Sequence, residues 1–262
     1  YKGEDITKWS AHQMSSFRGK CCSIVFQDPM TSLNPVFTIG NQLREAIELH
    51  TDKKGKAAKA RAIEMLELVG INEPEKRVKQ YPFELSGGMR QRVMIAMALA
   101  CEPDILIADE PTTALDVTIQ AQILELIADL QKKMGMAVIL VTHDLGVIAD
   151  MCDNIIVMYG GHICERGTAD EIFYNSRHEY TKGLLRSIPN VNNMKQKLIP
   201  IAGTPINILN LPKGCAFCAR CDEAMKICLE QQPEELHINE NHYASCWMNV
   251  KKQLEAEGGA QK

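Results

Sequence analysis

The stretch from Leu85 to Asp116 constrains the fold of this chain more than any other part of its 262 residues. It opens with Ser86-Gly87-Gly88, at the start of an apolar helical pattern that runs to about residue 100. Two glycines at a helix start let a ligand approach free backbone N–H groups, and the positive end of the helix dipole favours a phosphate. An apolar strand at 105–108 then ends in Asp109 and Glu110, and paired carboxylates there suit Mg²⁺ and a polarised water. Together these features predict a nucleoside triphosphate site.

Two more apolar strands are expected, at residues 22–26 and 137–141, and each ends in a polar side chain. Gln27 follows the first strand, and His143 follows the second. Helical patterns, with apolar residues three and four positions apart, occupy residues 39–49, 56–69 and 117–134. Strands that alternate with helices in this way predict an α/β fold with a mostly parallel sheet. A hairpin is expected across Gly160-Gly161, and residues 1–6 are expected to form a strand or the end of a hairpin.

The motifs in this order resemble those of the ABC-transporter ATPase family. Residues 85–89 are similar to its signature, residues 105–110 to its Walker B strand, and Ala114-Leu115-Asp116 to its D-loop. The resemblance implies an ABC-type, RecA-like ATPase core with a helical subdomain, followed here by a small cysteine-rich C-terminal extension. The boundaries expected from it are residues 1–37 for part of the core, 38–100 for the helical subdomain, 101–176 for the rest of the core and 177–262 for the extension.

In this family two ATPase subunits close over ATP, with the signature of one facing the nucleotide of the other. The resemblance therefore implies that Ser86, Gly87, Gly88 and Gln91 bind the nucleotide held by a partner subunit.

The same resemblance assigns roles around the chain's own ATP. Glu110 would polarise the attacking water, and Asp109 would hold Mg²⁺ through water. Gln27, in the Q-loop position, and His143, in the position of the switch histidine, would complete the catalytic site. Asp116 would couple the two sites across the dimer.

A narrower resemblance points to ATPases of the importers for peptides and nickel. Residues 30–35 are similar to a run found there, and residues 178–185 resemble the segment that opens their C-terminal extension, with Glu179 in place of the usual proline. The group implies import of di- or oligopeptides, powered from the cytoplasmic face of the inner membrane by a peripheral subunit. The implied partners are a second ATPase subunit that is expected to be a paralogue, two membrane permease subunits and an extracytoplasmic peptide-binding protein. The alternatives are an importer for nickel or another small solute, and a soluble ABC ATPase without a transport role.

The phosphate-binding loop of such ATPases, G-x-x-x-x-G-K-[ST], does not occur in the 262 residues. The chain is therefore expected to be truncated before this loop, and inactive as an isolated ATPase.

Five cysteines in the last fifth of the chain suggest a metal site. Cys215, Cys218 and Cys221 alone have a ferredoxin-like spacing, which a fourth thiolate would complete. The importer family instead implies a [4Fe–4S] cluster on Cys215, Cys221, Cys228 and Cys246, with Cys218 as an extra thiol. Zinc is the alternative metal, because four thiolates suit either. Reduced structural cysteines are the remaining interpretation.

Charge and hydropathy exclude two other classes of protein. The formal net charge is −4 and the isoelectric point is about 6.0, which argues against nucleic acid as the main partner. No apolar run approaches the length needed to span a membrane.

Overall fold

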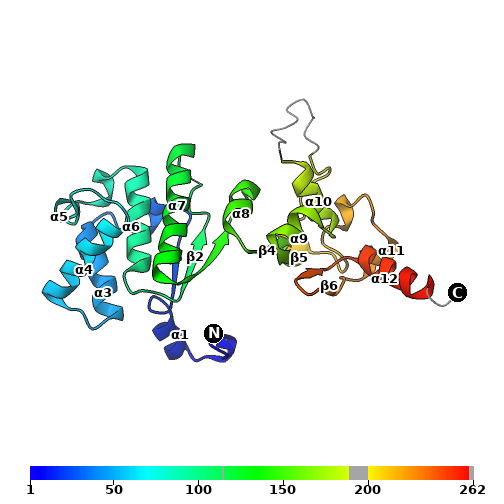
Figure 1. Ribbon diagram of the computed structural model, residues 1–262, viewed down its shortest axis with the longest axis horizontal. Coiled ribbons are helices and arrows are strands. Elements are labelled where there is room, and N and C mark those ends of the chain that lie inside the picture. The colour runs from blue at the N-terminus through cyan, green and yellow to red at the C-terminus, as the bar shows by residue number, and fades with distance from the viewer. Residues whose placement is uncertain (114, 189–199, 260–262) are drawn as a thin grey trace. The chain divides into compact units, whose positions relative to one another are not determined.

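The computed structural model describes residues 1–113, 115–188 and 200–259. It consists of two compact units, Tyr1–His143 and Asp144–Lys262, which are described separately. The first unit is an α/β structure, and the second is built on an antiparallel sheet (Figure 1).

The first unit contains a three-stranded parallel sheet in the order β1-β2-β3. Its strands are β1 (Cys22–Val25), β2 (Ile105–Asp109) and β3 (Ala137–Val141). Val25 lies beside Ala108, and Ala108 beside Leu140, so the three strands end at one edge of the sheet. The parallel sheet predicted from the alternation of strands and helices is confirmed. Its carboxyl edge gathers the residues that follow each strand.

Two helices flank the sheet in this unit, α6 (Gly87–Leu99) and α7 (Val117–Met134). Helix α6 packs against β1 and α7. The buried side chains of α7 are Ile123, Ile127 and Leu130, spaced by one helical turn, as its amphipathic pattern requires.

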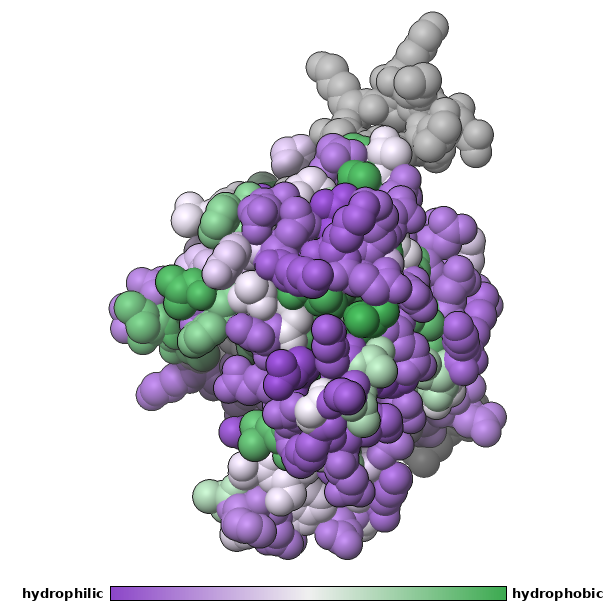
Figure 2. Space-filling model, turned by 90° about the vertical axis from the view of Figure 1, so that its left-hand side faces the viewer, coloured by the Kyte–Doolittle hydropathy of each residue, from purple (hydrophilic) through white to green (hydrophobic). Residues whose placement is uncertain are grey.

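Four further helices surround α6 and form the helical part of the unit. They are α2 (Pro29–Ser32), α3 (Ile39–His50), α4 (Gly55–Leu68) and α5 (Pro74–Arg77). Helices α3 and α4 pack on each other and on α6, with Leu43, Ile47, Met65 and Leu66 fully buried between them. Figure 2 shows this end of the chain as a mostly hydrophilic surface, interrupted by separate hydrophobic patches.

The two faces of the parallel sheet differ in burial. Side chains paired in register lie on the same face, and Val25, Leu106 and Ala108 on one face are fully buried. On the other face, Ile24 and Ile139 lie on either side of Ile107 in register and are 39% and 52% exposed. Within the described residues, this second face of the sheet remains open to solvent.

The N-terminal segment corrects one expectation from the sequence. Residues 1–6 form no strand, because Lys2 and Gly3 adopt positive φ angles of 47° and 86° and turn the chain. A short 3₁₀ helix, η1 (Ile6–Lys8), and helix α1 (Ala11–Phe17) follow.

The second unit contains a four-stranded antiparallel sheet in the order β4-β5-β7-β6. Strands β4 (Asn154–Tyr159) and β5 (His162–Thr168) form the predicted hairpin, with Gly160 and Gly161 both at positive φ. Strand β7 (His242–Ala244) pairs with β5, and β6 (Leu236–Asn239) pairs with β7. The sheet therefore joins residues from both sides of the boundary expected between residues 176 and 177.

Mostly short helices accompany this sheet. They are α8 (Leu145–Met151), α9 (Ala169–Tyr174), α10 (Glu179–Arg186), α11 (Lys226–Glu230) and α12 (Trp247–Gly259), with 3₁₀ turns η4 (Ile208–Asn210) and η5 (Cys218–Arg220). Helices α9 and α10 pack against the sheet. Two of the C-terminal cysteines lie in these elements, Cys218 at the start of η5 and Cys228 in α11. Part of the linker expected near residues 188–213 lies outside the described residues. In the part of the chain that is described, no helix combines the length and the apolar character needed to cross a membrane.

Candidate functional site

Glu110, the residue directly after β2, is the centre of a polar cluster at the carboxyl edge of the parallel sheet. Its Oε1 lies 2.9 Å from Nδ1 of His143, and its Oε2 accepts hydrogen bonds from Nε2 of Gln27 at 2.8 Å and from Oγ1 of Thr113 at 2.7 Å. Gln27 and His143 each lie two residues beyond the ends of β1 and β3. Three neighbouring parallel strands thus deliver the three predicted catalytic residues to one point.

The backbone at Glu110 is unusual as well. Its φ is +42°, a left-handed conformation that costs a residue with a side chain about 1–2 kcal/mol. The Glu110 N–H donates to the carbonyl of Val141 at 2.8 Å, which ties this conformation to the end of β3. Backbone strain of this kind occurs often at functional sites.

The donors around Glu110 also fix its charge. The hydrogen bond from Thr113, followed by that from His143, holds the pKa of the Glu110 carboxyl below its usual value. Glu110 is therefore an ionised acceptor at neutral pH, able to orient a water molecule and to take up its proton.

Asp109 is the last residue of β2, where it pairs with Val141 in the sheet, and its side chain is partly exposed. Two consecutive carboxylates at a strand end supply the hard oxygen ligands that Mg²⁺ prefers. The residues present therefore fit a magnesium ion.

Ser86 caps the N-terminus of α6, where its Oγ accepts a hydrogen bond from the Met89 N–H at 3.3 Å. Gly87 and Gly88 form the first turn, as predicted. A Cβ at Gly88 would lie 2.9 Å from Cγ2 of Ile119 on α7, whereas a Cβ at Gly87 would meet nothing closer than 3.8 Å. Gly88 is thus needed for packing, whereas a Cβ at Gly87 would make only an ordinary contact with Leu115.

Gln91 and Asp116 take structural positions in this conformation. Gln91 is 1% exposed, and among the described residues its Nε2 has no hydrogen-bond partner. Asp116 is the N-cap of α7 and accepts from the Ile119 N–H at 3.1 Å. The first residue of the expected D-loop, Ala114, lies outside the described residues.

The five C-terminal cysteines line one small cavity of about 20 Å³ in the second unit. Its backbone frame is tight, because the Cys215 N–H donates to the Cys228 carbonyl at 2.8 Å and a Cβ on Gly214 would overlap that carbonyl. Burial raises the pKa of Cys215 and of Cys221 to about 11. These thiols are neutral at pH 7 unless a cation binds them.

The cysteine cavity does not have the geometry of a formed metal site. In the described ranges, no three His, Cys, Asp or Glu side chains come together closely enough to hold a metal ion. The predicted ligands Cys215, Cys221, Cys228 and Cys246 are therefore neighbours around a cavity, and a metal centre there requires their sulfurs to reorient. Cys218 lines the same cavity, so the structure does not distinguish a ligand set that includes Cys218 from the set without it.

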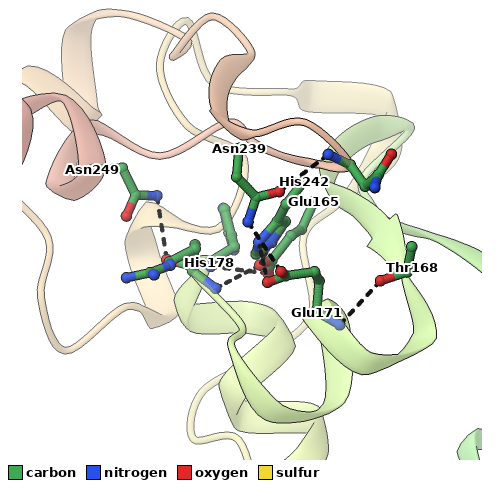
Figure 3. A network of polar contacts seen from close by, with 9 residues as sticks. Glu165, Thr168, Glu171, His178, Asn239, His242 and Asn249 are labelled. Carbon is green, nitrogen blue, oxygen red and sulfur yellow. Dashed lines mark hydrogen bonds and ion pairs between the residues drawn. The ribbon is translucent and has the colours of Figure 1, made fainter.

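A buried polar network beside this cavity was not predicted from the sequence (Figure 3). His242 on β7 and Glu165 on β5 are both fully buried, with His242 Nε2 2.7 Å from Glu165 Oε1. Glu165 also accepts from the backbone N–H groups of Arg177 and His178. The Nδ1 of His242 lies 3.2 Å from a carboxylate oxygen of Glu171, without hydrogen-bond geometry. This network attaches the start of α10 to the sheet.

Comparison with known proteins gives the family. Residues 1–113 match the family described as "ABC transporter", and residues 164–228 match "Oligopeptide/dipeptide transporter, C-terminal region". The chain is 54% identical over 249 residues to the oligopeptide transport ATP-binding protein OppD of Bacillus subtilis (strain 168), which covers 95% of this chain and 70% of OppD. The chain belongs to the oligopeptide/dipeptide family of ABC-transporter ATP-binding proteins. It is also 51% identical to the dipeptide transport ATP-binding protein DppD of the same organism, over 95% of this chain and 74% of DppD.

Solved structures of ABC ATPases agree with this assignment. A dimeric post-hydrolysis state of the ATP-binding cassette MJ0796, bound to ADP and Pi, superposes with a TM-score of 0.57 at 28% identity, covering 64% of this chain and 72% of that one. CbiO1 from Clostridium perfringens superposes with a TM-score of 0.56 at 29% identity, covering 63% of this chain and 64% of that one. The predicted ABC-type fold is confirmed.

In this ABC ATPase the predicted residues fall into separate groups. Gln27, Glu110 and His143 meet at the carboxyl edge of the sheet, while Ser86, Gly87 and Gly88 lie together at the start of α6. Thr113 was missed, although it contacts Glu110 directly. The available signal was its position three residues after Glu110, the spacing at which a tight turn returns a side chain to the residue that opens it.

Proposed function

We propose that this ABC ATPase hydrolyses ATP to drive the import of di- or oligopeptides, with Glu110 as the group that accepts the proton of the attacking water. The observation that carries the proposal is the meeting of Gln27 and His143 on the Glu110 carboxylate, in a chain 54% identical to an oligopeptide transport ATP-binding protein. Water forms a new bond to the γ-phosphorus, the bond to the bridging oxygen of ADP breaks, and the water proton passes to a Glu110 Oε atom. Gln27 and His143 orient the water and the γ-phosphate.

The charged groups at the strand ends support this chemistry. Phosphoryl transfer is catalysed mainly by positioning and by charge neutralisation. Mg²⁺ would supply part of that neutralisation when bound, held by Asp109 through water and by Gln27. In P-loop ATPases, the lysine of the phosphate-binding loop supplies a further positive charge. The 262 residues contain no such loop and therefore do not provide this lysine.

The start of α6 is proposed to act on the nucleotide of a second ATPase subunit. Ser86 Oγ and the N–H groups of Gly87 and Gly88 would bind its γ-phosphate, because these groups point out of the helix start. The side chain of Gln91 is buried, so Gln91 would support this site through packing within the helical layer and would not contact the nucleotide directly. Asp116, which caps α7, would transmit closure between the two sites.

The proposed assembly contains a second ATPase subunit that is a paralogue, two membrane permease subunits and an extracytoplasmic peptide-binding protein. In it, the ATPase subunit lies against the cytoplasmic face of the inner membrane. The names of the relatives, which include both oligopeptide and dipeptide transport proteins, support peptides as the cargo.

The test is ATP hydrolysis and peptide uptake by the purified transporter, reconstituted with all its subunits in vesicles. Glu110→Gln is expected to lower the ATPase rate by roughly 10²–10⁴-fold and to abolish uptake of a labelled tripeptide. Glu125→Gln, an exposed position on α7, is the matched control and should leave both rates unchanged. Uptake of nickel in place of peptide would support the alternative cargo, and full activity of Glu110→Gln would refute the assigned base.

We also propose that Cys215, Cys221, Cys228 and Cys246 hold a [4Fe–4S] cluster, with zinc as the alternative. The four cysteines, of which Cys228 is buried and the other three are partly exposed, converge on one cavity, and this supports the proposal. Bound metal would offset the raised pKa of Cys215 and Cys221. A chain prepared without oxygen should contain about four iron and four sulfide and absorb visible light broadly. Cys221→Ala should lose the iron, whereas Cys152→Ala, outside the cavity, should keep it. Zinc without iron would show that these cysteines hold zinc and not the cluster. A chain with neither iron nor zinc would refute the metal site.

A further inference from the structure

We infer that Thr113 is a positioning residue for the reaction, whose hydroxyl keeps the Glu110 carboxylate in place while Gln27 and His143 turn to the nucleotide. This inference rests on the proposed function of Glu110. It concerns a residue outside the motifs that the resemblance to ABC ATPases assigned.

The first argument is the occupation of the Glu110 carboxylate. An ionised carboxylate offers about four lone-pair positions. In the structure, Oε2 accepts from Thr113 Oγ1 at 2.7 Å and from Gln27 Nε2 at 2.8 Å, and Oε1 faces His143 Nδ1 at 2.9 Å. With three positions filled, one lone pair, on Oε1, is left to receive a water proton. Glu110 gains further acceptor positions when Gln27 or His143 turns away from it.

The second argument is that the three donors differ in their attachment to Glu110. Gln27 and His143 are 83 and 33 residues away in the chain and lie on the segments that follow β1 and β3. Thr113 belongs to the same turn as Glu110, and its N–H donates to the Glu110 carbonyl at 3.3 Å. Gln27 and His143 can therefore separate from Glu110 when the strand-end segments move, whereas Thr113 moves with it.

The third argument is the anchoring of this turn on both sides. The Glu110 N–H is bonded to the carbonyl of Val141 on β3, and Oγ1 of the buried Thr112 accepts from Nε2 of Gln120 on α7 at 3.2 Å. Pro111, which joins Glu110 to Thr112 in the chain, is buried. An anchored turn holds the Thr113 hydroxyl at a fixed place, which a positioning group requires.

The electrostatic effect of Thr113 agrees with the geometry. Among the groups that lower the pKa of Glu110, the hydrogen bond from Thr113 has the largest effect, ahead of the one from His143. The direction of this shift agrees with the short hydrogen bond from Thr113 Oγ1 to Glu110 Oε2, at 2.7 Å.

The experiment compares Thr113→Val, which removes the hydroxyl at nearly constant shape, with Thr113→Ser, which keeps it. In the reconstituted transporter, Thr113→Val should lower kcat roughly tenfold with little change in KM for ATP. Thr113→Ser should restore kcat, because the hydroxyl holds Glu110. Thr204→Val, an exposed position in the second unit, is the matched control and should behave as the unchanged protein.

A second readout needs no turnover. In the 262-residue chain at a fixed neutral pH, the ¹³C NMR signal of the Glu110 side-chain carboxyl, assigned by its loss in Glu110→Gln, should shift in Thr113→Val, because the carboxylate loses a hydrogen-bond donor. The signal should return to its original position in Thr113→Ser. An unchanged signal in Thr113→Val, an unchanged kcat, or a failure of Thr113→Ser to restore kcat would each overturn the inference. If Glu110→Gln stays active, the proposed function of Glu110 fails, and the NMR signal then decides separately whether Thr113 bonds to Glu110.

Discussion

The Nε2 atom of His242 lies 2.7 Å from Oε1 of Glu165, and neither side chain has any exposed surface. These residues are 77 positions apart, on the adjacent strands β7 and β5. Glu165 also receives the N–H groups of Arg177 and His178, so one buried carboxylate connects the hairpin, the start of α10 and the C-terminal strand (Figure 3).

Glu165→Gln should destabilise the second unit. The neutral amide leaves one of the buried donors without an acceptor, and a buried donor left unsatisfied in this way costs about 1–3 kcal/mol. Urea denaturation, followed by a probe in the second unit, measures the loss. Glu234→Gln, at an exposed position, is the control, and equal midpoints for the two variants would contradict the importance of the network.

His178 should make the stability of the second unit depend on pH. Its burial lowers its pKa from 6.5 to about 4, and its Nδ1 accepts from the Tyr180 N–H at 3.1 Å, so the folded protein holds it neutral. The unfolded chain takes up this proton below about pH 6.5, so stability is complete above that pH and falls as the pH decreases toward 4.

Between pH 7.5 and pH 5 the loss from His178 should be about 2 kcal/mol. It is measured as the free energy of unfolding of the metal-free chain at the two pH values. His178→Asn keeps a side-chain cap for α10 and removes the titration. A variant with the same pH dependence as the unchanged chain would show that another group is responsible.

Gly87 and Gly88 should respond differently to alanine. Gly87→Ala places its Cβ in ordinary van der Waals contact, 3.8 Å from Cδ2 of Leu115, and gains helix propensity, so the thermal midpoint should stay level or rise. Gly88→Ala brings its Cβ within 2.9 Å of Ile119, and overpacking of this kind costs about 1–3 kcal/mol. Calorimetry of the pair under one set of conditions provides its own control, and a lower midpoint for Gly87→Ala than for Gly88→Ala would contradict the packing shown by α6 and α7.

Arg220 should control the segment that crosses the β4–β5 hairpin. Its guanidinium donates to the carbonyls of Ile201 and Ala202, both at 2.9 Å, and to the Tyr159 hydroxyl at 3.3 Å. Arg220→Ala should speed amide hydrogen exchange at residues 201–206 by roughly tenfold or more, because each lost bond to a charged donor is worth about 1.5–3 kcal/mol. Lys213→Ala, in an exposed loop, is the control, and unchanged exchange in Arg220→Ala would show that packing alone holds the segment.

Local patterns were sufficient to predict much of the first unit. The helix at 117–134 and the strand at 137–141 have the predicted bounds, because the spacing of apolar residues along the chain indicates each element directly. The proximity of Gln27, Glu110 and His143 could also be predicted, since the carboxyl ends of parallel strands share one edge of a sheet.

Contacts between distant residues could not be predicted in the same way. Strand β7 has only three residues, two of them polar or aromatic, and its partner β5 lies far back in the chain, so no local pattern predicts the pairing. The burial of Glu165 follows from that pairing, so it could not be predicted from a local pattern either. The cysteine spacing indicated neighbours correctly, but the positions of their sulfurs depend on side-chain rotamers, which spacing does not determine.

The open face of the parallel sheet, with Ile24 and Ile139 on either side of Ile107, makes the stability of the first unit conditional on its surroundings. Any molecule that binds this face in the folded state alone raises the free energy of unfolding by mass action. A detergent, a neighbouring protein or an apolar dye can therefore change the melting temperature of the chain without touching Glu110. Melting temperatures of this protein are comparable only when such additives are matched.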